Sequence, residues 1–283
     1  TLQTILVDIV LVVLALAATA KIRSGSREAL SPRGLQNLFE FIVETLYNLA
    51  EGVLGKRTRQ VFWLGATIFF FVLFANWMEL LPGVDSVGYF IPAHEEGYGR
   101  NGILMVLPKE EAKAEAKPGE QPAEKAEGER WELVPFVRAA ATDLNVTLAL
   151  AIISVVMTQV YGFKALGVQY LGKFFATKRL GQGNAMGLID LIVGVLELIS
   201  EFAKIISFTF RLFGNIFAGA VLLFVMAAFL IPFLVFGTLI FYGLEVFVGL
   251  IQAVVFMMLT FVFIAMATAG HGEGEHGQAE HAH

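Results

Sequence analysis

The chain has 283 residues, of which 57% are hydrophobic and 16% are charged, and its formal net charge is −5. A soluble domain contains about 45–50% apolar and about 25% charged residues, so this composition excludes an ordinary soluble fold. The absence of cysteine excludes disulfides, thiolate metal sites and cysteine nucleophiles, and the small net charge indicates no nucleic-acid partner.

Long apolar stretches follow one another along the chain, and a membrane-spanning helix needs about 20 such residues. The sequence therefore predicts an all-α integral membrane protein with five membrane helices. We read the first stretch as a retained span and not a signal peptide, because Asp8 lies inside it. The apolar stretches run roughly over 2–20, 61–81, 144–161, 186–231 and 233–269.

Basic residues between these stretches set the expected orientation. Lys and Arg are frequent in 21–59 and 164–179, whereas neither occurs from 82 to 99. By the positive-inside rule the two basic segments are cytoplasmic. With five spans, the N-terminus is then outside and the C-terminus is in the cytoplasm. The expected segments are a first membrane helix (1–22), a cytoplasmic basic loop (23–60), a second membrane helix (61–82), an external loop (83–141), a third membrane helix (142–162), a cytoplasmic loop (163–185), a helical hairpin (186–269) and a His-rich cytoplasmic tail (270–283).

Three polar or amphipathic segments stand between or after the spans. Apolar residues at helical spacing over 35–50, with glutamates on the other face, predict an amphipathic helix on the membrane surface. The segment 109–130 (KEEAKAEAKPGEQPAEKAEGER) is charged in both signs and cannot bury enough apolar area to fold alone. The tail after Ala269 holds four of the five histidines, and we favour a disordered polar tail over a metal site.

The last two apolar stretches are too long for upright spans. Residues 186–231 contain no proline, and 46 helical residues extend about 69 Å, against about 30 Å for a bilayer core. Either this stretch breaks or it lies steeply tilted, and no Gly-Pro or Asn-Gly pair supports a break. Pro232 marks the turn, so the two stretches are expected to form a long, strongly tilted hairpin that would suit a curved partner.

Polar residues within the fourth stretch recur at spacings of three or four and so share one helix face. Charged side chains are costly inside a membrane, which makes each one a functional candidate. For Glu197 and Lys204, a structural ion pair and a place in a pathway are equally favoured. This set, the polar stripe, comprises Glu197, Ser200, Lys204, Ser207, Arg211 and Asn215.

The fifth stretch adds Glu245 and Gln252, one heptad apart on one face. Arg211 lies 21 residues before Pro232 and Gln252 lies 20 after it, so an antiparallel hairpin places them at the same depth. Glu245 then lies level with Gly219. Arginine does not release its proton in proteins, so Arg211 can hold a carboxylate ionised and repel cations, which separates two half-pathways.

Two motifs contain these residues, SFTFRLFGNIFAG at 207–219 and QAVVFMMLT at 252–260. Through them, and over nearly its whole length, the chain resembles subunit a of the membrane sector of bacterial rotary ATP synthases. The resemblance implies an ion-conducting stator that is not itself an enzyme, with Arg211 as the essential arginine facing the carboxylates of a rotor ring. It further implies that the outer half-channel is bordered by Asn215, Glu245 and Gln252, and the cytoplasmic one by Glu197, Ser200, Lys204 and Ser207.

The same resemblance implies the partners and the compartment. These are a rotor ring of c subunits, peripheral-stalk b subunits and the lipid bilayer of a bacterial inner membrane, with no cofactor, metal, nucleic acid or directly bound nucleotide. Many relatives carry Glu where this chain has Ala220, and some carry His where it has Glu245, so the acidic group is expected to have moved to the facing helix. H⁺ and Na⁺ remain alternatives, because the ion site would lie on the ring.

Three other classes of protein fit less well. A secondary transporter usually has internal repeats with matched broken helices, and none is seen. A haem subunit is excluded because no His lies in an apolar stretch and no Cys exists. The segment 167–173 (GVQYLGK) nearly matches a phosphate-binding loop, but Phe174 replaces the required Ser or Thr.

Overall fold

The computed structural model describes residues 2–23, 34–81, 88–92, 103–106, 130–135, 144–173, 185–229 and 234–269. Five helical segments within them are long and apolar enough to cross a membrane, which confirms the predicted helical membrane fold. The helices are α1 (Leu2–Arg23), α2 (Leu35–Leu54), α3 (Thr58–Glu79), α4 (Leu144–Leu166), α6 (Ala185–Phe229) and α7 (Leu234–Thr268), with short 3₁₀ turns η2 (Gly55–Arg57) and η4 (Gly167–Lys173).

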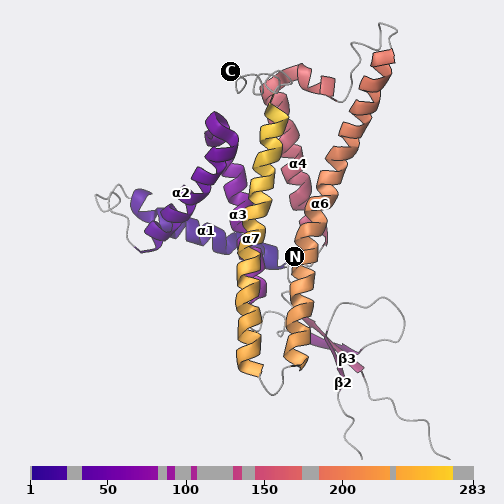
Figure 1. Ribbon diagram of the computed structural model, residues 1–283. Helices are drawn as coiled ribbons and strands as arrows, with labels where there is room; N and C mark the ends of the chain where they lie inside the picture. Colours follow the sequence, from indigo (N-terminus) through magenta and orange to yellow (C-terminus); the bar gives the residue numbers. More distant parts are fainter. Residues whose placement is uncertain are drawn as a thin grey trace, which may run out of the picture.

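The long fourth stretch forms one unbroken helix. α6 has 45 residues, which is about 68 Å of helix and more than twice the thickness of a bilayer core. Of the two alternatives left by the sequence, the unbroken helix is therefore the one observed. Figure 1 shows α6 and α7 joined at one end and α6 leaning away from α7 with distance from that end. The turn residues 230–233 lie outside the described residues.

α7 is the central helix, and it contacts α2, α3, α4 and α6. Its contact with α3 is close because Gly65 has no side chain. A Cβ at that position would overlap the ring of Phe261, which is completely buried. On the side of α4, the buried hydroxyl groups of Ser154 and Thr260 are hydrogen-bonded at 2.8 Å. Glycine and small polar residues of this kind allow helices to approach closely in membranes.

Side chains near both ends of α3 donate hydrogen bonds to the main chain of α7, and one main-chain carbonyl just after α3 accepts a bond from a side chain of α7. Indole and amide N–H groups donate to the main chain of α7 near one end, and a guanidinium donates near the other. These bonds fix α7 along its own axis against α3. They join Asn76 Nδ2 to Gly249 O (3.3 Å), Trp77 Nε1 to Val246 O (3.1 Å), Arg57 Nη1 to Thr268 O (2.8 Å) and Tyr242 OH to Leu80 O.

The first two helices lie at the side of this core. Figure 1 shows α1 running across the direction of α7 instead of along it. Its start is joined to α3 by Gln3, whose amide nitrogen donates to Ala75 O at 3.5 Å. α2 covers the predicted amphipathic segment, and it buries Leu46 and Ala50 in the core while its glutamates stay exposed. Its position on the membrane surface remains a prediction.

Three short strands follow α3 and precede α4 along the chain, and they form a small antiparallel sheet that the sequence analysis did not predict. Its strands are β1 (Gly88–Pro92), β2 (Ile103–Val106) and β3 (Arg130–Pro135), in the order β1-β3-β2. They are only four to six residues long and flank the charged insertion. The charged residues of the insertion dominate the composition of the loop, so the sequence analysis treated the whole loop as irregular. Within that insertion only Arg130 is described, and the His-rich tail lies outside the described residues.

Candidate functional site

The polar stripe lies along one side of α6, as its spacing predicted. Ser200, Ser207 and Arg211 are exposed, and the other three members are half-buried. Arg211 has no hydrogen bond or ion pair within the described part of the chain. Large apolar side chains surround it on the same surface, among them Phe210, which is 59% exposed. The guanidinium therefore stands uncompensated on an apolar surface of a helix long enough to cross a membrane.

The register of the hairpin agrees with the depth expected from the sequence. The rings of Phe208 on α6 and Phe256 on α7 are 4.6 Å apart between centroids, and Glu245 lies against Gly219. These two pairs place Arg211 and Gln252 at nearly the same level. Their side chains nevertheless point differently, since Arg211 is exposed and Gln252 is only 7% exposed, and no hydrogen bond joins them in the described residues.

The carboxyl group of Glu245 occupies space that glycine leaves free on α6. A Cβ added at Gly219 would lie less than 3.0 Å from three atoms of that carboxyl group. Ala220, the neighbouring position at which the sequence analysis noted a missing acid, is instead exposed. Consecutive helical residues point about 100° apart, so Gly219 backs Glu245 and Ala220 does not.

Two buried amides near Glu245 have an atom without a partner. Asn76 on α3 donates from Nδ2 to Gly249 O, but its Oδ1 is unsatisfied, and so is Nε2 of Gln252. Asn76 is bonded to Gly249, which lies one helical turn before Gln252 on α7. The unpaired acceptor, Asn76 Oδ1, and the unpaired donor, Gln252 Nε2, are therefore about one helical turn apart. Buried polar groups usually bond to protein or to ordered water, so this region is suited to hold water.

A hydrogen-bonded cluster joins α6, α4 and η4 on the inner side of α6, and a cation–π contact extends it to α7. Glu201 accepts from Lys204 Nζ at 2.7 Å and from Gln159 Nε2 of α4 at 2.8 Å. Tyr170 of η4 donates from its hydroxyl group to Gln159 Oε1 at 2.7 Å. Lys204 Nζ also lies 5.0 Å from the ring centroid of Phe263 on α7. The ion pair recorded for Lys204 is therefore with Glu201, three residues before it on the helix.

Sequence reasoning missed Glu201 and Asn76 as site residues. Both signals were present, because each is a polar residue inside an apolar stretch. Glu201 also lies four residues after Glu197 and three before Lys204, which is helical spacing. The polar stripe was traced through Ser200 instead, and Glu201 points inward to α4 while Ser200 is exposed.

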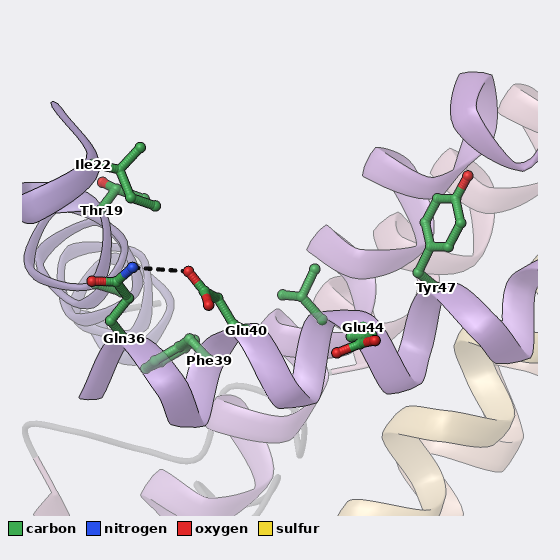
Figure 2. Close-up of a pocket in the computed structure, with 9 residues that line it drawn as sticks. Thr19, Ile22, Gln36, Phe39, Glu40, Glu44 and Tyr47 are labelled. Atoms are coloured by element: carbon green, nitrogen blue, oxygen red, sulfur yellow. Dashed lines mark hydrogen bonds between the residues drawn. The ribbon is translucent and has the colours of Figure 1, made fainter. Parts of the chain in front are cut away.

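A separate groove of about 490 Å³ lies between α1 and α2. Figure 2 shows Thr19 and Ile22 of α1 beside Gln36, Phe39 and Glu40 of α2, with Gln36 Nε2 donating to Glu40 Oε1 at 2.9 Å. All residues that line this groove belong to α1 and α2, so it does not reach the polar stripe. Among the described residues, no group of three or more His, Asp or Glu side chains could hold a metal ion.

Comparison with known proteins adds an independent finding. A family model described as "ATP synthase A chain" matches residues 2–265. "ATP synthase subunit a" of Helicobacter hepaticus is 29% identical over 266 residues, which cover 93% of this chain and 86% of that protein. The proteins of the same description from Syntrophobacter fumaroxidans and Mycobacterium ulcerans are each 28% identical. They cover 89% and 94% of this chain and 74% and 86% of their own lengths.

Proposed function

Since this chain belongs to the ATP synthase A chain family, the proton-conducting stator subunits of the Fo membrane sector, we propose that Arg211 separates two half-pathways for protons. The chain is a multi-pass membrane subunit that transports protons and is not a catalyst on its own. One observation carries the assignment of Arg211: its guanidinium is exposed on an apolar helix surface, and no counter-charge pairs with it among the residues that the structure describes.

An arginine in this position needs a carboxylate from another subunit. Arginine stays protonated in proteins, and an unpaired charge at membrane depth is costly. Four exposed residues in line with Arg211 along the axis of α6 are small, so a partner helix can come close along that line. They are Ala203, Ser207, Gly214 and Ala218. We assign the carboxylates of a rotor ring of c subunits as that partner, and each carboxylate passing Arg211 is held ionised.

The outer half-pathway runs along the turn-side half of the hairpin. Glu245 is its titrating group, while Asn215, Gln252 and Asn76 supply hydrogen-bonding side chains. The unpartnered atoms of the two buried amides support this assignment, because they would bond to the water that carries protons. The side chain of Glu245 projects from α7 onto the backbone of Gly219 and is half-buried. Its exposed part can exchange protons with such water.

The second half-pathway leads along α6 in the opposite direction, past Ser207, Lys204, Ser200 and Glu197. The basic segments of the sequence support a cytoplasmic exit there, with the N-terminus outside and the C-terminus inside a bacterial inner membrane. The half-pathways are offset because each opens on its own side of Arg211. A proton therefore crosses only by riding on the ring, which couples proton flow to rotation. Peripheral-stalk b subunits complete the proposed set of partners.

Substitution of Arg211 tests this function. In the assembled complex, Arg211→Ala and Arg211→Lys should both abolish ATP synthesis driven by a proton gradient, because the compact ammonium of Lys lacks the planar guanidinium. Arg59→Ala is the matched control, since Arg59 is an exposed arginine of α3 outside the polar stripe, and it should synthesise ATP normally. Normal coupled synthesis in either Arg211 variant would refute the assignment.

A further inference from the structure

The polar stripe carries two cations, and within the described part of the chain only one of them is paired with a carboxylate. Lys204 and Arg211 are seven residues apart, which is about 10.5 Å along the helix. Lys204 is paired with Glu201 at 2.7 Å, whereas Arg211 has no ion pair in the described residues. Both cations border the route assigned to protons, so the difference between them requires an explanation that neither the family nor the proposed half-pathways supply.

We propose that Glu201 is a positioning residue that neutralises Lys204 and so leaves Arg211 as the uncompensated cation of the polar stripe. The proposal rests on the proposed function, since it assigns an electrostatic condition to the second half-pathway. A positive charge at Lys204 repels protons that pass between the ring and the membrane surface. With Glu201 ionised beside it, the pair is neutral and the barrier to protons lies at Arg211.

The contacts of Glu201 support an ionised carboxylate at this position. Glu201 is only 7% exposed, and its oxygens accept from two different donors, Lys204 Nζ and Gln159 Nε2. Because Gln159 uses its nitrogen as a donor to Glu201, its oxygen is the acceptor for the hydroxyl group of Tyr170. Donors thus point toward Glu201 along the whole chain of bonds. An ionised carboxylate is the form that only accepts.

The same contacts hold the pair in place. Tyr170 is 1% exposed, and its ring lies where a side chain on Gly162 would be, so η4 is packed against α4. Lys204 is held from the other side by the ring of Phe263. Side chains from α4, η4 and α7 therefore keep the carboxylate beside Lys204, and the pair cannot rotate away as an exposed ion pair does.

Proton flow through the assembled complex in membrane vesicles tests the proposal with four proteins. These are the unmodified chain, Glu201→Gln, Lys204→Met and the double variant, whose summed charges at positions 201 and 204 are 0, +1, −1 and 0, while Glu197 is the same in all four. Glu201→Gln keeps the shape of the side chain but leaves Lys204 unpaired. We expect it to slow proton flow roughly tenfold, which is the effect of one charge about 10 Å away at an effective dielectric constant of about 20.

The double variant decides between electrostatics and packing. If Glu201 acts by neutralising Lys204, the neutral double variant should be faster than Glu201→Gln. If the pair only staples helices, the two losses should add and the double variant should be the slowest, which would overturn the proposal. Should Glu201→Gln fail to assemble, the double variant alone decides, and its failure to assemble or conduct would also overturn it.

Failure of the proposed function would look different in this assay. In that case Arg211→Ala would conduct and couple like the unmodified complex, whatever the charges at 201 and 204. Failure of the present proposal alone leaves Arg211 essential and removes only the recovery in the double variant. The amount of complex recovered from the membranes is measured for each variant, so that rates refer to equal amounts of protein.

Discussion

Adding one methyl group at Gly219 should disable the outer half-pathway. A Cβ there would lie less than 3.0 Å from three atoms of the Glu245 carboxyl group, closer than real Cβ contacts. Gly219→Ala must therefore displace the carboxyl group or separate α6 from α7. Overpacking of this kind costs about 1–3 kcal/mol. The displaced carboxyl group must regain its position to carry protons, and this return costs the same free energy. Because about 1.4 kcal/mol corresponds to a factor of ten in a rate, proton flow should fall about ten- to a hundredfold.

The assay is passive proton flow through the membrane sector in vesicles, together with ATP-driven pumping by the whole complex. Gly243→Ala is the matched control, because Gly243 lies two residues before Glu245 on the same helix and has nothing within 4 Å of an added Cβ. Shortening the acid should relieve the overlap. The double variant Gly219→Ala with Glu245→Asp is therefore expected to conduct better than Gly219→Ala alone.

Two results would refute this reasoning about Gly219. Unchanged proton flow in Gly219→Ala would mean that Glu245 does not need its position against the backbone of α6. A double variant no faster than Gly219→Ala would mean that the loss comes from something other than the overlap with the carboxyl group. Either result would remove the packing of Glu245 on Gly219 from the description of the outer half-pathway.

Three further predictions concern the packing, the expected topology and the charged insertion. Gly65→Ala should reduce the amount of assembled complex, since a Cβ there overlaps the buried ring of Phe261, and Gly52→Ala, with open space around it, is the control; equal yields would contradict the close α3–α7 contact. Protease added outside should cleave within 109–130 but spare the tail after residue 270, and cleavage of both from one side would contradict five spans. Deleting 113–127 should leave proton flow intact, because that segment lies outside the polar stripe.

Much of the helical architecture could be predicted because it depends on local chemistry. Apolar length gives the spans, and the absence of a breaker before Pro232 gives the unbroken α6. The register of the hairpin also followed, since Gly219 and Glu245 are nearly equidistant from the turn and two straight helices preserve that symmetry. Arg211 became the leading candidate for a similar reason, since an arginine inside an apolar stretch is conspicuous by itself.

The remaining features depend on contacts between distant residues. Glu201 reaches Gln159 on α4, and Asn76 reaches α7, so their importance comes from helices that the sequence does not align with each other. The sequence also does not show which of two neighbouring residues on a helix faces the next helix. Gly219 and Ala220 are adjacent in the sequence, and only the packing of α7 shows which of them backs Glu245. The three short strands escaped notice because their pairing spans the charged insertion.

The bonds between α3 with its flanking turns and α7 bear on how the subunit withstands torque. A turning rotor ring, the partner proposed above, would push sideways on α6, and the hairpin would resist only if α7 does not slide. Arg57, Asn76 and Trp77 bond to the main chain of α7, and Tyr242 bonds to that of Leu80. A slide of one residue, about 1.5 Å, would break all four at once, at a net cost of about 2–6 kcal/mol. In the proposed rotary function, elastic energy would therefore be stored outside the α3–α7 contact.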